Sequence, residues 1–532
     1  MITLYDYQND CVNATRREIA EGHKSILIQS PTGSGKTVIF SYIAKSAIEK
    51  GGRVLILTDR IELLTETGGT LEQFGIKNHL ITAGQMAPPP PYWPCFVGMA
   101  QTLVRRITPK KYPHEWAAWF KQFAIVIIDE AHKQTFNPFF TENPDLFNGA
   151  QILGFTATPS RMGKMRQLGQ DYSKMIEGLQ VPDLIKRGKL LPDKYYTVLA
   201  PQKSTYKLNS RGDDYDENDM FKAFDRPEYY EGAIEAYKTH APGTTNLVFC
   251  CNIQHVIRTC EEFNAAGIPA KFLTSSVAKP KKPDSDNPGR LARYERDLER
   301  YNNWAAAYAK YSGDRKTLLS EWMRGDFKVM INAGILTTGF NFPALRTIQV
   351  LRATVSVPLW LQIIGRGSRI HPGKEYFIIL DHGQNGHRLG RYRDIRQWSL
   401  IHEESKGEGV APVKECGGKP DKKGRPGCGA YINASATICP FCGYTYPTEK
   451  ERIKAELQLL SYDIMPTPGA PVRKQFEFED IERTAASRGY KDAWVVRQIG
   501  IKHGREGLRQ YAKSKGYSSG WVFMTAKRLG IA

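Results

Sequence analysis

The segment Ser30–Thr37 constrains the fold most strongly. It reads Ser-Pro-Thr-Gly-Ser-Gly-Lys-Thr, follows the apolar run Ser25–Gln29, and precedes a helical pattern of apolar residues. The glycines let backbone N–H groups turn inward around phosphate oxygens, and the N-terminus of the following helix adds a positive field. The strand, loop and helix together predict a nucleoside triphosphate site in a parallel α/β domain.

The side chains of this loop have distinct expected roles. Lys36 would neutralise the β- and γ-phosphates, and the hydroxyl of Thr37 would bind Mg²⁺. The first position is Ser30, where the usual pattern has glycine. The other residues expected to surround the phosphates are Thr32, Gly33, Ser34 and Gly35.

Continuous apolar runs alternate with helical patterns along the first 400 residues. Such runs are typical of parallel strands that are covered on both faces. They form two groups that separate near residue 200, so we expect two tandem α/β domains, at 1–200 and 201–400. The predicted strands are Ser25–Gln29, Arg53–Thr58, Ala124–Ile128, Ile152–Phe155, Asn246–Cys250, Lys328–Ile331, Thr347–Leu351 and Tyr376–Leu380.

Two carboxylates follow one of these strands, in the sequence Asp129-Glu130-Ala131-His132. Ligands of open α/β sheets bind at the carboxyl ends of the strands. We therefore expect Asp129 to bind Mg²⁺ and Glu130 to polarise the attacking water. The alternative is a solvated acidic pair after a core strand, which the neighbouring phosphate loop disfavours.

The Asp-Glu-Ala-His sequence after such a loop resembles the DEAH-box branch of superfamily 2 helicases, and the resemblance covers about residues 1 to 395. It implies two RecA-like P-loop domains, with ATP and Mg²⁺ as cofactors and nucleic-acid-dependent ATP hydrolysis as the activity. The remaining family motifs follow in order: Tyr7-Gln8, Thr156-Ala157-Thr158, Thr337-Thr338-Gly339-Phe340-Asn341, and Gln362 to Arg369.

The resemblance also implies roles for single residues. Arg369 would be the arginine finger with Arg366 as its partner, because an arginine from a second domain stabilises the γ-phosphoryl charge when the domains close. The alternative is that both arginines only form salt bridges at the domain interface. Asn341 stands where the family commonly has an acidic residue. Gln8 would contact adenine, Gly339 and Gln362 would contact the nucleotide, and His132, Thr156 and Thr158 would couple hydrolysis to nucleic-acid binding.

The expected polymer is DNA. With 74 Lys and Arg against 55 Asp and Glu, the chain carries a net charge of +19, which attracts polyanions. Gln362 stands where DEAD-box RNA helicases have histidine, and the motif spacing resembles XPB-like proteins, type III restriction motors and bacteriophage helicases. The resemblance implies single-stranded, forked or branched DNA, with RNA as an alternative and an ATP-driven clamp without unwinding as another. The expected contacts are Arg60, Gln101 and Thr102.

Residues from about 275 to 316 are charged, with Tyr, Trp and Ala at helical spacing, and predict a helical insertion into the second domain. A solvated helical hairpin and a wedge that contacts nucleic acid are both compatible with this pattern. Deleting the insertion and measuring DNA affinity would separate the two.

Four cysteines gather late in the chain and predict a structural zinc ribbon at 413–446. Four free thiols are the alternative. The remaining five cysteines are scattered, as expected for buried apolar residues in a cytosolic chain. The predicted zinc ligands are Cys416, Cys428, Cys439 and Cys442.

The C-terminal residues 474–532 are rich in basic and aromatic residues and predict a small helical domain. Its aromatic side chains suit either nucleic-acid stacking or a hydrophobic core. The sequence has no apolar run of about 18 residues and no signal-peptide pattern, so no membrane segment is expected. The expected location is the cytoplasm of a bacterial or phage-infected cell.

Overall fold

The structure is a computed structural model, and two compact units divide the chain. The first unit comprises Met1–Glu403 with Leu459–Pro466, and the second comprises Glu404–Gln458 with Thr467–Ala532. The residues that the structure describes are 3–107, 115–142, 145–147, 149–161, 166–197, 206–283, 287–337, 340–400, 413–415, 431–433, 445, 463–464, 492–517, 522 and 524–525.

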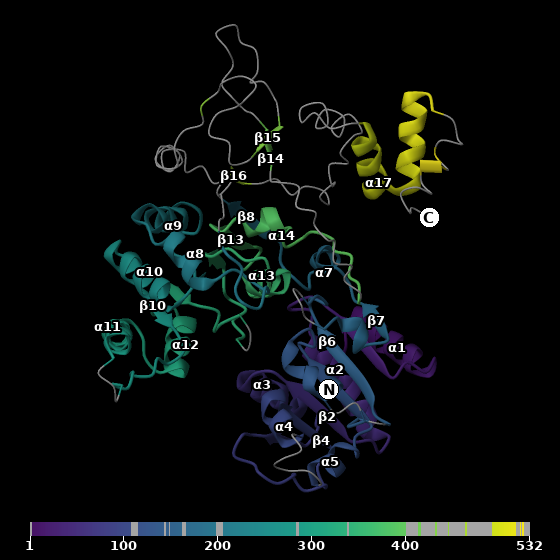
Figure 1. The fold of residues 1–532 in the computed structure, drawn as a ribbon. Coiled ribbons are helices and arrows are strands. Elements are labelled where there is room, and N and C mark those ends of the chain that lie inside the picture. The colour runs from purple at the N-terminus through teal and green to yellow at the C-terminus, as the bar shows by residue number, and fades with distance from the viewer. Residues whose placement is uncertain are drawn as a thin grey trace. The chain divides into compact units, whose positions relative to one another are not determined.

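The N-terminal half of the first unit is a seven-stranded parallel sheet between two layers of helices (Figure 1). The strand order is β3-β4-β2-β5-β6-β1-β7. The strands are β1 (Ser25–Gln29), β2 (Val54–Thr58), β3 (Asn78–Ile81), β4 (Cys95–Met99), β5 (Ile125–Asp129), β6 (Gln151–Thr156) and β7 (Lys174–Glu177). The helices are α1 (Asp6–Ala20), α2 (Lys36–Glu49), α3 (Ile61–Gln73), α4 (Ala100–Ile107), α5 (Glu115–Phe120), α6 (Asn137–Thr141) and α7 (Val181–Lys186).

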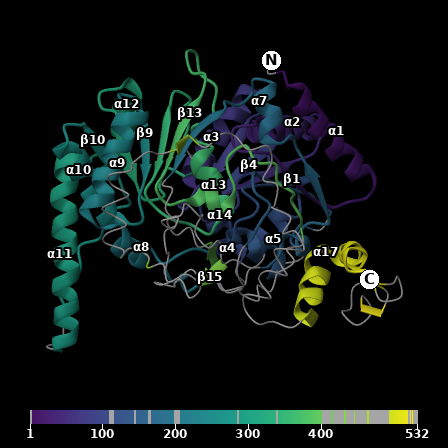
Figure 2. The same ribbon diagram turned by 90° about the horizontal axis from the view of Figure 1, so that it is seen from above.

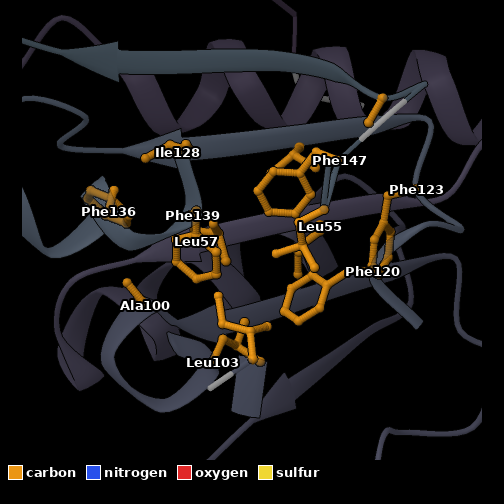
Figure 3. Packing of buried hydrophobic residues seen from close by; sticks show 14 of the residues in the cluster. Leu55, Leu57, Ala100, Leu103, Phe120, Phe123, Ile128, Phe136, Phe139 and Phe147 are labelled. Carbon is orange, nitrogen blue, oxygen red and sulfur yellow. The ribbon is translucent and has the colours of Figure 1, made fainter. Parts of the chain in front are cut away.

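Alternation along the central strands produces a hydrophobic core on each face of this sheet. Leu55 and Leu57 of β2 belong to one core, while Val54 and Ile56 belong to the other, because successive side chains point to opposite faces. Figure 3 shows the first of these cores, in which Phe120 of α5 packs with Leu55 and other apolar side chains. This double burial explains why the strands are uniformly apolar and were predictable from sequence.

The C-terminal half of the first unit is a second seven-stranded sheet, ordered β10-β11-β9-β12-β13-β8-β16. All its pairings are parallel except that between β16 and β8. The strands are β8 (Asp193–Thr197), β9 (Asn246–Phe249), β10 (Ala270–Leu273), β11 (Val329–Asn332), β12 (Thr347–Val350), β13 (Phe377–Asp381) and β16 (Asp463–Ile464). The helices are α8 (Glu217–Phe224), α9 (Pro227–His240), α10 (Ile253–Ala265), α11 (Pro288–Tyr311), α12 (Arg315–Arg324), α13 (Val357–Ile364) and α14 (Asn385–Leu389).

The predicted fold class, tandem α/β domains with parallel sheets, is confirmed. Each of the eight predicted strands is present, with ends that agree to within one residue. One element differs from the proposed boundary: β8 lies in the second sheet, although it precedes residue 200. It is held there by pairing with β13, a long-range contact that local sequence does not report.

The insertion contains one long helix rather than two matched ones. Helix α11 has 24 residues and is followed by the shorter α12. Figure 2 shows α11 along one edge of the second domain, with one end projecting beyond it. Its C-terminal half is fixed to the end of β10, because Trp304 Nε1 donates to Thr274 Oγ1 (3.1 Å) and Ser312 Oγ donates to Phe272 O (2.8 Å).

Residues 391–400 return from the second domain to the first. Gly169 N donates to Leu400 O (2.9 Å), and Leu400 packs against the core of the first domain. Gln180 Nε2 donates to Arg396 O (3.0 Å) in the same segment. The chain therefore runs between the two domains twice, once from β7 to β8 and once through this returning segment.

The second unit is described in part. Strands β14 (Val413–Glu415) and β15 (Tyr431–Asn433) pair antiparallel, and α17 spans Asp492–Lys515. The four cysteines of the predicted zinc ribbon lie outside the described residues. So does most of the predicted C-terminal domain apart from α17 and a few residues after it. Among the helices that are described, none combines the length and apolar character needed to cross a bilayer.

Candidate active site

The phosphate-binding loop lies between β1 and α2, as predicted. Gly33 and Gly35 have φ angles of 86° and 88°, a region that only glycine adopts without strain. Ser34 Oγ lies 2.6 Å from Ser30 Oγ and donates to Pro31 O (2.7 Å), so the loop is held by its own side chains. Lys36 begins α2, and its Nζ lies 3.4 Å from Ser30 O.

The start of α1 packs directly on this loop. Tyr7 Oη donates to Ser34 O (2.7 Å), and Gln8 Nε2 donates to the same carbonyl (3.2 Å). A side chain at Gly35 would collide with Gln8 Nε2, at 2.5 Å. The buried Gln8 therefore lies beside the nucleotide loop, although it is 26 residues from Ser34 in sequence.

Asp129 and Glu130 lie together at the carboxyl end of β5. Glu130 has a φ of 52°, which is unusual for a residue other than glycine. Burial and the Glu130 carboxylate raise the pKa of Asp129 to about 7. Burial opposes ionisation of Glu130 as well, but the nearby Lys36 ammonium and the other positive charges around it together outweigh burial and hold the pKa of Glu130 below its usual value. Two buried carboxylates that repel each other in this way form a suitable site for a divalent cation.

His132 links this acidic pair to the end of β6. Its Nδ1 shares a hydrogen bond with Thr156 Oγ1 (2.8 Å), and Thr158 N donates to the same hydroxyl oxygen (3.0 Å). Burial lowers the pKa of His132 to about 4, so the ring is neutral near pH 7. The structure therefore brings together His132, Thr156 and Thr158, which the sequence had grouped only by family resemblance.

A buried arginine supports the loop after β5 through hydrogen bonds to its backbone carbonyls. Arg161 Nε donates to His132 O (2.9 Å), and its Nη2 donates to Ala131 O (3.1 Å). Its Nη1 donates to Asp171 Oδ2 (2.7 Å), and both side chains of this pair are almost completely buried. Arg161 was missed at the sequence level, although it stands three residues after Thr158. An arginine this close to a motif indicates a supporting role only once the groups that it hydrogen-bonds are known.

The second domain meets these residues through α13 and the turn after it. Gln362 Nε2 lies 3.4 Å from Glu130 Oε2, across the domain boundary. A side chain at Gly33 would meet Leu190 at 2.9 Å and Ser368 at 3.5 Å, and one at Gly365 would meet Thr32 at 2.8 Å. The turn that carries the predicted arginines therefore lies against the phosphate loop.

The two arginines are held differently. Arg366 is buried, and it donates through Nε to Thr337 O (2.9 Å) and through Nη1 to Phe340 O (2.7 Å). Burial, then the neighbouring Arg369, lowers the pKa of Arg366 to about 9. Arg369 is less buried and contacts Phe340 O (3.1 Å) and Asn341 Oδ1 (2.8 Å) through Nη1. Gly339, the remaining predicted nucleotide contact of this segment, lies outside the described residues.

A second unpredicted residue holds the start of α13. Asp214 accepts hydrogen bonds from Arg352 Nη2 (2.8 Å), Thr354 Oγ1 (2.9 Å) and Val355 N (3.0 Å). The next residue, Ser356, caps α13 by accepting from Leu359 N (3.3 Å). Since Asp214 is 138 residues from Arg352 in sequence, no local pattern could have identified it.

The predicted nucleic-acid residues lie at neighbouring strand ends of the first sheet. Arg60 follows β2 and Gln101 follows the adjacent β4. Gln101 is exposed and Arg60 is half-buried, whereas Thr102 is buried at the start of α4. Of these three residues, Gln101 and Arg60 are therefore accessible to a polymer.

The arrangement has the parts that phosphoryl transfer requires. A glycine-containing loop with Lys36 suits phosphates, and Thr37 and Asp129 offer hard oxygen ligands for Mg²⁺. Mg²⁺, when bound, would neutralise part of the negative charge of the phosphates. The chain would contribute Glu130 as an acceptor for a water proton and guanidinium groups from the second domain.

Comparisons with known proteins agree with this geometry. Residues 1–161 match the family described as "Type III restriction enzyme, res subunit". The chain is an ATPase. A 51.5 kDa protein of a Lactococcus phage (isolate 7-9) is 26% identical to this ATPase over 451 residues, which are 82% of each chain.

Two further similarities concern a named helicase and a solved structure. The Saccharomyces cerevisiae protein IRC3, provisionally named an ATP-dependent helicase, is 26% identical over 396 residues, 71% of this ATPase but only 51% of IRC3. A fragment structure of a protein assigned provisionally as the HsdR subunit of a type I restriction enzyme from Vibrio vulnificus has a TM-score of 0.50 at 19% identity. It covers 72% of this ATPase and 65% of the HsdR chain, and shows that the two share the tandem RecA-like fold.

Proposed function

We propose that this ATPase moves along DNA, using ATP hydrolysis to separate strands or remodel branches. The observation that carries the proposal is the contact of Gln362 with Glu130, which places second-domain groups at the carboxylates of the first domain. A site divided between two domains converts nucleotide binding into domain closure, and hydrolysis into reopening. Repeated closure on a polymer produces stepwise movement.

The proposed roles of individual residues follow the family resemblance and are compatible with the geometry. Lys36 and Thr37 would hold the phosphates and Mg²⁺, Glu130 would activate water, and Arg369 would stabilise the transition state. Thr156 and Thr158 would transmit the state of this site through their hydrogen bonds with His132. The alternative of purely structural arginines is less well supported, because the turn that carries them lies against the phosphate loop.

DNA is the proposed polymer on two grounds. The matched family is described by a restriction enzyme subunit, and restriction enzymes act on DNA. The net charge of +19 suits a phosphate backbone. Contacts by Arg60 and Gln101 would be to the backbone and largely independent of sequence.

An ATPase assay with different polymers tests this function. We expect single-stranded or forked DNA to stimulate turnover, and a labelled fork to be separated in an ATP-dependent manner. Blunt duplex, four-way DNA and RNA serve as comparisons. Stimulation by RNA alone would replace the proposal with an RNA helicase, and stimulation by DNA without strand separation or branch remodelling would replace it with an ATP-driven clamp.

Zinc is a separate proposal that rests on sequence alone. The four cysteines are positioned in the chain around β14 and β15, with Cys416 directly after β14 and Cys428 shortly before β15. We propose that they hold one structural Zn²⁺ without an open coordination position. Metal analysis of the purified protein is expected to give about one zinc per chain, and protein without zinc would contradict the proposal.

A further inference from the structure

A groove of about 870 Å³ lies on the second domain. Helices α8 and α10 form one side, and the inserted helix α11 forms the other. The floor includes Asn252, Ser275 and Ala333, which follow β9, β10 and β11. The groove therefore opens at the carboxyl ends of three neighbouring parallel strands, the edge at which α/β sheets bind ligands.

The interior of the groove is aromatic and amide-rich. Its lining carries three acidic and three basic side chains, among them the ion pair of Arg258 with Asp225 at 3.5 Å. A nearly neutral lining of this kind suits nucleobases, which stack on rings and exchange hydrogen bonds with amides, better than it suits phosphates. The aromatic and amide residues are Phe221, Trp304, Tyr311, Asn218, Asn252, Gln254 and Asn303.

Basic residues lie close in sequence to one side of the groove. Lys279, Lys281 and Lys282 are exposed and follow within a few residues of Ser275 and Val277, which line the groove. Arg300 of α11 also lines it, with 63% of its side chain exposed. These cations would meet the phosphates of a strand whose bases enter the groove.

The wall formed by α11 is held firmly. Trp304 is fixed by its hydrogen bond to Thr274 Oγ1 and by packing against Tyr308, with ring centroids 5.0 Å apart. Ala307 is buried, and Tyr308 Oη donates to Gly313 O (2.8 Å). An immobilised aromatic face loses little conformational entropy when a base stacks on it.

The groove is also connected to the ATP site through the chain. Ala333 lines the groove, and four residues later Thr337 O accepts the hydrogen bond from Arg366 Nε. A ligand that moves the segment between them would move the contact of a predicted catalytic arginine. A ligand bound in the groove would in this way change the position of Arg366 at the nucleotide site.

We propose that the inserted helix α11 supplies one wall of a binding site for single-stranded nucleic acid, with bases in the groove and phosphates against Arg300 and the three lysines. The proposal rests on the proposed function and assigns part of the polymer's path. Of the two interpretations of the insertion, it selects contact with nucleic acid. The projecting N-terminal half of α11 remains outside this site.

Matched charge reversals test the site in the full-length protein. Arg300→Glu alters a groove residue, and Arg296→Glu makes the same change one turn earlier, at an exposed position that does not line the groove. For fluorescent oligodeoxythymidine, we expect Arg300→Glu to weaken binding about fivefold or more and to reduce the salt dependence by about one phosphate contact. Arg296→Glu should change affinity less than about twofold. Equal effects of the two variants would overturn the proposal.

Photocrosslinking locates the strand without any substitution. An oligonucleotide that carries 5-iododeoxyuridine should crosslink to peptides that contain Trp304 or Tyr311. Crosslinks confined to the first domain, or competition by blunt duplex as strong as by the single strand, would contradict the site. Failure of every polymer to stimulate ATP turnover would instead refute the proposed function. Normal DNA stimulation in the Arg300→Glu variant, together with crosslinks only elsewhere, would refute the groove alone.

Discussion

Replacing Arg369 by alanine is expected to lower kcat by about a thousandfold, because a guanidinium that acts on the γ-phosphoryl contributes mainly in the transition state. Nucleotide affinity should change only slightly, since the phosphate loop and Lys36 belong to the other domain. Arg369 is the better candidate for this role than Arg366, whose Nε and Nη1 are engaged by two backbone carbonyls. Steady-state ATP hydrolysis and binding of a fluorescent ATP analogue measure the two effects separately.

The control for this experiment is Arg346→Ala. Arg346 is an exposed arginine of the same domain whose Nη2 donates to Gly373 O (2.6 Å), so its loss should leave turnover unchanged. Arg369→Lys tests geometry, because a lysine keeps the charge but not the planar donor group. Normal turnover in Arg369→Ala would show that the arginines of this turn have only a structural role.

Replacing Arg161 by methionine is expected to lower kcat about a hundredfold and to destabilise the first domain by about 3 kcal/mol. The stability loss follows because the buried Asp171 would keep only Arg166 as a charged partner. The loss of turnover has a different cause. Without the donors of Arg161, the carbonyls of Ala131 and His132 lose their support, and the loop that carries Glu130 can relax from its left-handed backbone conformation.

A second substitution separates these two causes. In Arg161→Met combined with Asp171→Leu, the buried charge is gone, so the melting temperature should recover much of its loss. The value of kcat should stay low, because neither carbonyl has regained a donor, while KM for ATP should change little. Recovery of kcat together with stability would mean that Arg161 only supports the fold and does not position the acidic loop.

The parts of the site that were predictable lie next to uniformly apolar strands. The runs ending at Gln29 and Asp129 are buried on both faces, so their hydrophobic pattern marks them, and the residues after them fall at the ligand-binding edge. Strand β3 was missed for an equally local reason. Its four residues begin with Asn78 and His79, so it presents no continuous apolar run.

Residues that support the site from a distance could not be foreseen. Arg161 is recognisable only from its contacts with the carbonyls of Ala131 and His132, which fold back from β5. Asp214 belongs to a segment with no apolar pattern and acts on residues more than a hundred positions away. In the same way, helical spacing predicted α11, but only its packing against β10 placed Trp304 in a groove.

The central claim is that two domains of one chain enclose a single ATP, with phosphate ligands from the first and arginines from the second. It is tested most directly by ATP hydrolysis of the purified protein with single-stranded DNA, comparing the unaltered chain with Lys36→Ala. The claim predicts polymer-stimulated hydrolysis that falls to background in the variant. Hydrolysis that persists in Lys36→Ala, or none at all by the unaltered chain on any polymer, would contradict it.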